Sequence, residues 1–235
     1  LLQLLDANFG DWAQQEVPEQ QLPSITRSES GAIQVAAKEL PQTTIVIGDL
    51  GLTKDHPDQY AVRVLNYILG GGGFNSRMMR EIRSNRGLAY SAYSYFQVGR
   101  RLPGPFVAGT ETKNASVAPA LSLTRDIMED LRNNLVTDEE LLLAKESQIN
   151  SFVFGFENTH SVVSQQMSLA FFGYPEDYLA RYRDRIAAVT VADVQRAARE
   201  FIDLSRQQIV LVGDPEEFSN EIGKLGLPVV EVDLD

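Results

Sequence analysis

Two periodicities alternate along this 235-residue chain, and they predict which segments form strands and which form helices. The stretches "AIQVAA" and "QTTIVIGDLGL" read as strands, the second rich in β-branched residues. In "YAVRVLNYILGGGG", by contrast, apolar residues recur at helical spacing and indicate one apolar face: Ala61, Val64, Leu65, Ile68 and Leu69. The first part of the chain therefore combines strands with an amphipathic helix.

Capping residues predict where the helices begin. Each predicted start offers a side-chain oxygen that can accept a backbone N–H: Asp55 (with Pro57 in the first turn), Asn75, Asn114, Thr137 and Thr190. Thr137 is followed by Glu140, the pattern of a capping box before "LLLAKESQINSFVFGF". Two further helices are predicted across "THSVVSQQMSLAFF" and "PEDYLARYRDRIAAV". Most of the second half of the chain is thus expected to be helical.

A hairpin is predicted after the arginine-rich segment "SRMMREIRSNR". Leu88, Tyr90, Ala92, Phe96 and Val98 would share one face of a strand, because side chains alternate with period two. "RRLPGP" predicts the turn, and "FVAGTETK" the antiparallel return strand. The strand "QQIVLVGD" follows the last predicted helix.

Long helices among antiparallel strands predict an α+β fold, with an antiparallel sheet and helices packed on one face. Residues 1–31 begin with a short apolar helix and continue as a polar, Pro-containing stretch, which predicts a linker or arm from a preceding domain. Residues 32–235 are expected to form a single α+β domain. The start "LLQLLDANFGDW", which lacks a Met or a basic segment, suggests a piece of a longer protein.

Composition excludes several classes of function. A net charge of −11 and a pI near 4.7 argue against a general nucleic-acid binder and against binding to anionic membranes. The sequence has no run of about 18 apolar residues, so no membrane span is expected. With no cysteine, disulfides, thiolate metal sites and cysteine nucleophiles are excluded. The composition is compatible with either the bacterial cytoplasm or the periplasm.

The glycine run Gly70–Gly73 does not fit a phosphate loop, which follows a strand and ends in Lys-Ser/Thr. A helix C-cap explains one or two of these glycines, and four suggest a mobile loop or the close approach of a ligand to the backbone. His56 and His160 lie outside any zinc motif and are expected at the surface or near helix ends. We therefore expect no metal site in this chain, and the sequence has no G-x-S-x-G elbow.

Arg83 and Tyr90 form the remaining chemical candidate. Both side chains can donate hydrogen bonds to a carbonyl oxygen and stabilise charge that develops on it. Arg83 is predicted near a helix end and Tyr90 on the following strand, so that a tight turn could bring them side by side. The alternative is a surface cation and a core aromatic, and residue chemistry alone leaves both interpretations open.

The segment "PDQYAVRVLNYILGGGGFNSRMMREIRSNRGLAYSAYSYF" resembles the second domain of the pitrilysin/insulinase family of zinc peptidases, which includes the mitochondrial processing peptidases. "ANFGDW", "TDEELLLAKESQINSF" and "IAAVTVADVQRAAREFI" with "IVLVGD" extend this similarity along most of the chain. The resemblance implies the metallopeptidase fold shared by LuxS and the processing peptidases. It also implies two similar halves, each with two such domains, which close as a clamshell around a peptide.

For individual residues, the resemblance implies that zinc and the general base belong to an N-terminal domain, as H-x-x-E-H. Arg83 and Tyr90, seven residues apart, match the pair that binds the scissile peptide from the opposing half. The glycine-rich loop of the family corresponds to Gly70, Gly71, Gly72 and Gly73, with Phe74 and Asn75 next to it, although the loop here is shorter. These six residues are predicted to bind substrate.

The expected function is that of the C-terminal, substrate-binding domain of a zinc metalloendopeptidase that acts on peptides or unfolded polypeptides. This chain lacks the zinc ligands, so zinc would be held elsewhere in the parent assembly and the isolated chain would be inactive. The alternative is a non-catalytic scaffold or peptide-binding subunit of the same family.

Overall fold

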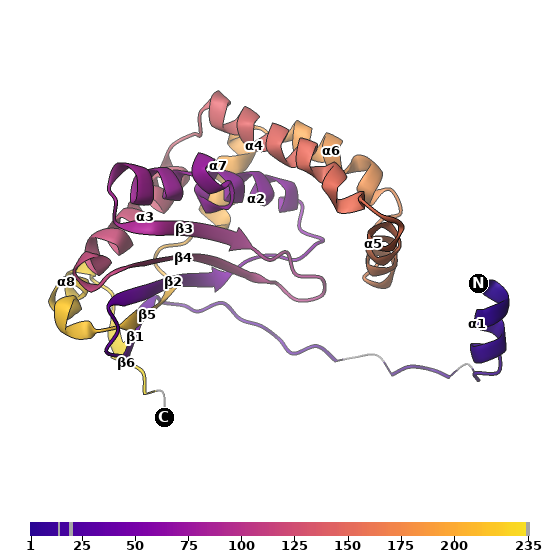
Figure 1. Cartoon of the computed structure of the whole chain (residues 1–235), viewed down its shortest axis with the longest axis horizontal. Helices are drawn as coiled ribbons and strands as arrows, with labels where there is room; N and C mark the ends of the chain where they lie inside the picture. Colours follow the sequence, from indigo (N-terminus) through magenta and orange to yellow (C-terminus); the bar gives the residue numbers. More distant parts are fainter. Residues whose placement is uncertain (14, 19–20, 234–235) are drawn as a thin grey trace.

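The computed structural model describes residues 1–13, 15–18 and 21–233 (Figure 1). Its strands are β1 (Ala32–Ala37), β2 (Gln42–Leu50), β3 (Ala89–Phe96), β4 (Pro105–Lys113), β5 (Gln208–Gly213) and β6 (Val229–Glu231). Its α-helices are α1 (Leu2–Phe9), α2 (Gln59–Asn66), α3 (Val117–Asn133), α4 (Asp138–Ser151), α5 (Thr159–Phe171), α6 (Tyr178–Ala188), α7 (Val191–Phe201) and α8 (Ser219–Ile222).

The described strands form one six-stranded sheet in the order β3-β4-β2-β5-β1-β6. Figure 1 shows α2, α3 and α7 over one face of this sheet, which confirms the predicted α+β class. The pairs β3–β4, β4–β2 and β2–β5 are antiparallel, whereas β1 runs parallel to both β5 and β6. Because β1 and β5 lie at opposite ends of the chain, no hairpin forces them to be antiparallel.

The core lies between the sheet and the helices above it. The apolar face predicted for α2 and the turn after it is buried there: Ala61, Val64, Leu65, Ile68 and Leu69. Ile45 and Ile47 of β2 and Phe106 of β4 pack into the same cluster. Burying one such large side chain contributes roughly 1.5–3 kcal/mol, so this shared layer fixes α2 and the glycine segment on the sheet.

Two predicted helix starts, Thr137 and Thr190, are confirmed, and the structure shows a capping box at each. The Thr137 hydroxyl accepts a hydrogen bond from the Glu140 backbone N–H (3.1 Å), and the Glu140 carboxylate accepts one from the Thr137 N–H (3.0 Å). Thr190 and Asp193 exchange the same pair of bonds at the start of α7. Both helices thus begin at the predicted residue.

The other three predicted caps are wrong. Asp55 binds the Lys54 ammonium (2.6 Å), and α2 begins after Asp58. The Asn114 side chain is buried, where it accepts a hydrogen bond from the Thr43 hydroxyl and donates one to the Leu40 carbonyl, so that α3 begins after Ser116. Ser76 replaces Asn75 as the cap of the next helical segment. Asp55 and Asn114 do not cap a helix because their side chains bind other partners.

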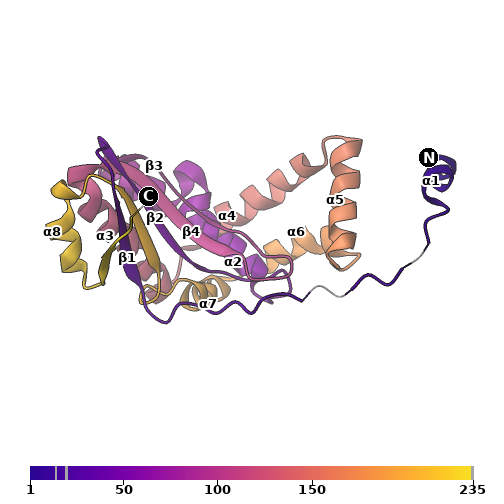
Figure 2. The same cartoon turned by 90° about the horizontal axis from the view of Figure 1, so that it is seen from below.

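Helices α4, α5 and α6 extend beyond the end of the sheet, and α5 lies at their far end (Figure 2). Helix α5 buries none of its residues, nor does α1, which stands apart from the sheet in both views. Among the described helices, none combines the length and the apolar character that a membrane crossing requires.

Candidate substrate site

The sequence suggested that the glycines end α2, but the structure shows helical backbone beyond Asn66. The helix continues as a π-helical turn, Tyr67–Gly71, followed by a short 3₁₀ turn, Gly73–Asn75. A Cβ on Gly70 would lie 2.4 Å from the backbone N of Ser94 on β3, so only glycine fits where the turn crosses this strand. Gly73 has φ +57°, a left-handed conformation that glycine adopts without strain. The close approach at Gly70 is therefore made by the chain's own backbone.

Ser76 starts the arginine-rich segment. Its hydroxyl accepts a hydrogen bond from the Met79 N–H (3.4 Å), and its extended backbone precedes a helical turn that becomes π-helical over Met79–Asn85. Met78 and Ile82 of this segment are buried in the core. The arginines therefore project from a segment whose opposite face is anchored.

Arg77 is not the solvated cation that an arginine-rich helix face suggests. Its side chain is only 11% exposed and donates two hydrogen bonds to Glu140 (2.7 Å each) and one to Asp130 (2.6 Å). Burial alone would raise the pKa of Glu140, but the hydrogen bonds from Arg77 and the Thr137 backbone outweigh it and lower that pKa. Arg77 thus joins the segment after the glycines to α3 and α4.

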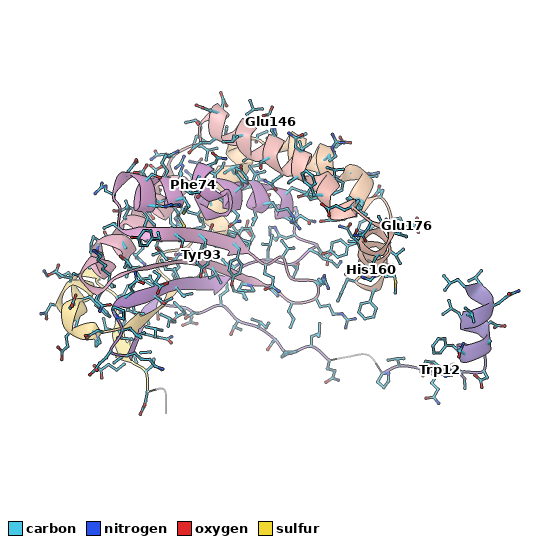
Figure 3. The ribbon with its side chains drawn as sticks, in the orientation of Figure 1. Trp12, Phe74, Tyr93, Glu146, His160 and Glu176 are labelled. Carbon is cyan, nitrogen blue, oxygen red and sulfur yellow. The ribbon has the colours of Figure 1, made fainter. Side chains whose placement is uncertain are left out.

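Arg83 has different surroundings. Its guanidinium carbon lies 4.5 Å from the centroid of the Phe74 ring, a distance suited to a cation–π interaction. Within the described part of the chain, Arg83 forms no ion pair. Phe74 itself is 66% exposed, and Figure 3 shows it on the helix-bearing side of the sheet, above β3. The donors of Arg83 are therefore free for a ligand.

Tyr90 lies in a β-bulge. Ala89 pairs with Thr112 and Ala92 with Thr110, so β3 carries one extra residue between two consecutive pairs. As a result Ala92 is buried while Tyr90 is 84% exposed, and the prediction that both share one face of a regular strand is wrong. The interpretation of Tyr90 as a core aromatic is wrong for the same reason. Its phenol is presented to solvent.

A tight turn connects the two candidates. The Gly87 N–H donates to the Arg83 carbonyl (3.1 Å), and the Leu88 N–H donates to the Ile82 carbonyl (2.9 Å). Gly87 has φ +62°, so the chain passes directly from the helical segment into β3. The structure brings Arg83 against Phe74, and no described contact joins the side chains of Arg83 and Tyr90. Their joint role in binding stays a prediction.

Phe74, the residue that stacks on Arg83, also lines a cavity of about 420 Å³. It is bordered by the glycine segment on one side and by the first turn of α4 on the other, with Tyr67, Phe74, Asn75, Arg80, Glu140 and Leu143 among its walls. Sequence reasoning did not find this cavity, because its two sides are far apart in the chain. Phe74 and Asn75, which were predicted to bind substrate, do line it.

Each of the two histidines has a polar partner nearby in the fold. His56 Nδ1 accepts a hydrogen bond from the Asp58 N–H (3.1 Å), while Nε2 faces Glu200 at 3.2 Å. His160 lies on α5, well away from Phe74 (Figure 3), and is near the Ser164 hydroxyl. No cluster of three or more His, Cys, Asp or Glu residues in residues 1–13, 15–18 and 21–233 could hold a metal ion.

The fold and the site thus define an α+β domain with free polar donors and a cavity between the segment that follows α2 and the start of α4. The family model described as "Peptidase M16 inactive domain" matches residues 1–148, which is more than half of the chain. The chain therefore belongs to the peptidase M16 inactive-domain family, and the resemblance to zinc peptidases drawn from the sequence is confirmed.

Relatives include both zinc proteases and a non-peptidase. An uncharacterized zinc protease of Streptomyces coelicolor is 31% identical over 183 residues, covering 74% of this chain and 37% of that protein. A Helicobacter pylori protein described as a non-peptidase homolog is 25% identical over 188 residues, covering 78% of this chain and 43% of its own length. The chain thus spans about two fifths of the length of these relatives.

Solved structures share the fold. A peptidase M16 inactive domain from Pseudomonas fluorescens matches with a TM-score of 0.77 at 29% identity, over 83% of this chain and 46% of that one. The periplasmic protease PqqL from Escherichia coli matches with a TM-score of 0.71 over 91% of this chain and 24% of its own. The identity to PqqL is 13%, so that likeness concerns the fold alone.

Proposed function

We propose that this chain is the substrate-binding, C-terminal domain of a zinc-dependent metalloendopeptidase. One observation carries the proposal: Arg83 forms no ion pair within the described residues, although it lies in an arginine-rich segment of a strongly acidic chain. A guanidinium left unpaired beside an exposed aromatic ring can donate to a peptide carbonyl. The exposed Tyr90 phenol supplies a second donor of the same kind.

The chemistry assigned to this chain is the binding of the scissile carbonyl. Hydrolysis of a peptide places negative charge on the carbonyl oxygen, and fixed N–H and O–H donors stabilise that charge. The described residues do not fit a zinc site, so zinc would activate water from another domain of the longer protein or from a partner half. Arg83 and Tyr90 would then face that site across the bound peptide.

Tyr90→Phe in the full-length assembly tests this role. It removes one hydroxyl from an exposed side chain, so folding should be unaffected while peptide hydrolysis falls by about 10²–10³-fold, the usual cost of losing an oxyanion donor. Tyr93→Phe on the same strand is the matched control and should leave the rate unchanged. Equal rates in wild type and Tyr90→Phe would contradict the assignment.

A second candidate is a peptide-binding or scaffold subunit without catalysis. It is favoured by the relative described as a non-peptidase homolog, which covers 78% of this chain. In that case Arg83 and Tyr90 would still bind polypeptide. If the parent gene and its neighbours encode no H-x-x-E-H, the enzymatic proposal is set aside in favour of this one.

A further inference from the structure

The β-bulge that exposes Tyr90 is held by side chains as well as by strand pairing. A bulge takes backbone groups out of the regular ladder, and such groups need other partners where they are buried. Two threonines of β4 provide them. The Thr112 hydroxyl donates to the Leu88 carbonyl (2.5 Å), and the Thr110 hydroxyl donates to the Ser91 carbonyl (2.7 Å). The backbone is thus bound on either side of Tyr90.

Both threonines occupy core positions of β4. Thr110 is 3% exposed and Thr112 is 1% exposed, on the strand face that also carries Phe106 and Ala108. Burying a hydroxyl is unfavourable unless the group forms a hydrogen bond, whereas an apolar side chain would fill the same space without that penalty. Pairing with the bulge carbonyls offsets the penalty, and an apolar residue at either position would leave the facing carbonyl unpaired.

Met79 provides the third contact. Its sulfur accepts a hydrogen bond from the Ala92 N–H (3.2 Å), directly after the bulge, and the side chain is buried. Met79 also begins the π-helical segment that carries Arg83. The same side chain therefore ties the segment of Arg83 to the strand of Tyr90, although no described contact joins the side chains of these two candidates.

We propose that Thr110, Thr112 and Met79 are positioning residues that fix the Tyr90 phenol relative to Arg83. The inference rests on the proposed function, because it takes Tyr90 as a donor to the scissile carbonyl. Such a donor must be held in place before charge develops, and a displacement of about 1 Å can lower a rate about 10²-fold. The Tyr90 side chain is exposed, so the backbone of the bulge sets its direction.

A purely structural role is the competing interpretation. Buried hydroxyls and a buried thioether stabilise a core wherever they lie, so a loss of stability in their variants does not distinguish the two roles. Coupling to Tyr90 does distinguish them. Contacts that act through the phenol lose their effect on the rate once the phenol hydroxyl has been removed, and a double-mutant cycle measures that coupling.

The test is such a cycle in the full-length assembly. Thr110→Val keeps the shape of the side chain but removes the hydroxyl, so kcat should fall about tenfold while KM stays within about twofold, as for an interaction made only in the transition state. In the Tyr90→Phe background the same substitution should change kcat less than about twofold. Thr110→Ser keeps the hydroxyl and should restore most of the rate. Thr124→Val is the matched control and should leave kcat near wild type, since Thr124 is equally buried but donates to the Ala120 carbonyl within α3 (2.8 Å).

Met79→Leu repeats the cycle without leaving a polar group unpaired on β4. Leu fills a similar volume but has no sulfur to accept the Ala92 N–H. The expected pattern is the same, with a lower kcat in the wild-type background and no further loss in Tyr90→Phe. Met78→Leu is the control, because Met78 is fully buried and its sulfur accepts no hydrogen bond from any described residue.

The outcomes separate this inference from the proposed function. Losses of kcat that are equal in both backgrounds, or no loss in either, overturn the positioning role and leave Tyr90 as a donor. Wild-type hydrolysis by Tyr90→Phe contradicts the proposed function and the positioning role with it. If no peptide is cleaved, the affinity for a fluorescent peptide, measured by anisotropy, replaces kcat in the same cycle. A loss in Thr110→Val that disappears in the Tyr90→Phe background then supports positioning, and equal losses or none overturn it.

Discussion

Two arginines of one short helical segment have opposite surroundings. Arg77 is nearly buried between the carboxylates of Glu140 and Asp130, and it links three helical segments. Arg83 stacks on an exposed ring and pairs with no carboxylate among the described residues. Arg77 is therefore a structural residue, whereas Arg83 is available to a ligand.

Phe74→Ala should weaken the proposed carbonyl site without unfolding the domain. A cation–π contact at an exposed position contributes about 0.5–1 kcal/mol, so kcat/KM for a peptide should fall about two- to fivefold as Arg83 loses its fixed orientation. Phe74→Tyr keeps the aromatic face and should retain the wild-type value. If both variants behave alike, Phe74 does not position Arg83.

Arg77→Ala should destabilise the chain by about 2 kcal/mol, somewhat below the 3–5 kcal/mol typical of a fully buried pair, because the partner carboxylates keep some contact with water. Urea unfolding at pH 7 measures the change. Arg80→Ala is the control, since Arg80 reaches Glu140 only at 3.9 Å and is half-exposed. A loss in Arg77→Ala no larger than in this control would contradict the structural role of Arg77.

The ion pair between Arg77 and Glu140 predicts that the stability of the folded chain depends on pH. The pKa of Glu140 in the folded chain lies below its ordinary value of 4.5, so its ionised form contributes stability above that value. This contribution is lost as the pH falls from about 4.5 through the lowered pKa. Wild type should therefore lose stability more steeply below pH 4.5 than Arg77→Ala, while Arg86→Ala should follow wild type. Parallel curves for all three would show that Arg77 does not lower this pKa.

At the level of elements, the glycine segment is held by β3. Gly70→Ala places a methyl group 2.4 Å from the Ser94 backbone N, and such overpacking typically costs about 1–3 kcal/mol. Gly155→Ala is the matched control, because no atom lies within 4 Å of its Cβ position. Thermal unfolding compares the two variants. Equal melting temperatures would mean that the turn is not packed against β3.

Sequence patterns predicted elements well where the determinants are local. The helix starts at Thr137 and Thr190 depend on residues three positions apart, and both are confirmed. Asn114 was wrongly predicted as a cap because its side chain is used by Thr43, far away in the sequence. The bulge at Tyr90 depends on how β3 pairs with β4, which strand alternation does not reveal.

At the level of the whole molecule, one group of exposed apolar side chains lies away from the sheet. Helix α5 buries no residue, and exposed apolar side chains gather on it and before it: Val153, Phe154, Val163, Met167 and Phe171. Patches of this kind often mark contacts with other protein surfaces. An exposed apolar surface of this kind fits a chain that spans about two fifths of the length of its relatives, because the longer proteins contain further surfaces that could cover it.

Metal analysis tests whether the zinc site lies in this chain or in the rest of the protein. The described residues contain no cluster that could hold a metal, so the isolated chain should bind no stoichiometric zinc. The full-length assembly should bind zinc if it is the proposed peptidase. One tightly bound zinc per isolated chain would place the metal site in this domain and contradict the assignment.

The most direct test of the central claim is the peptide-hydrolysis rate of Arg83→Ala compared with Arg86→Ala in the full-length assembly. Arg86 lies just past the same helical segment and is exposed, so it controls for the loss of a positive charge. If Arg83 binds the scissile carbonyl, kcat/KM should fall about 10²–10³-fold in Arg83→Ala and stay near wild type in Arg86→Ala. Equal rates in the two variants, with both folded, would contradict the account.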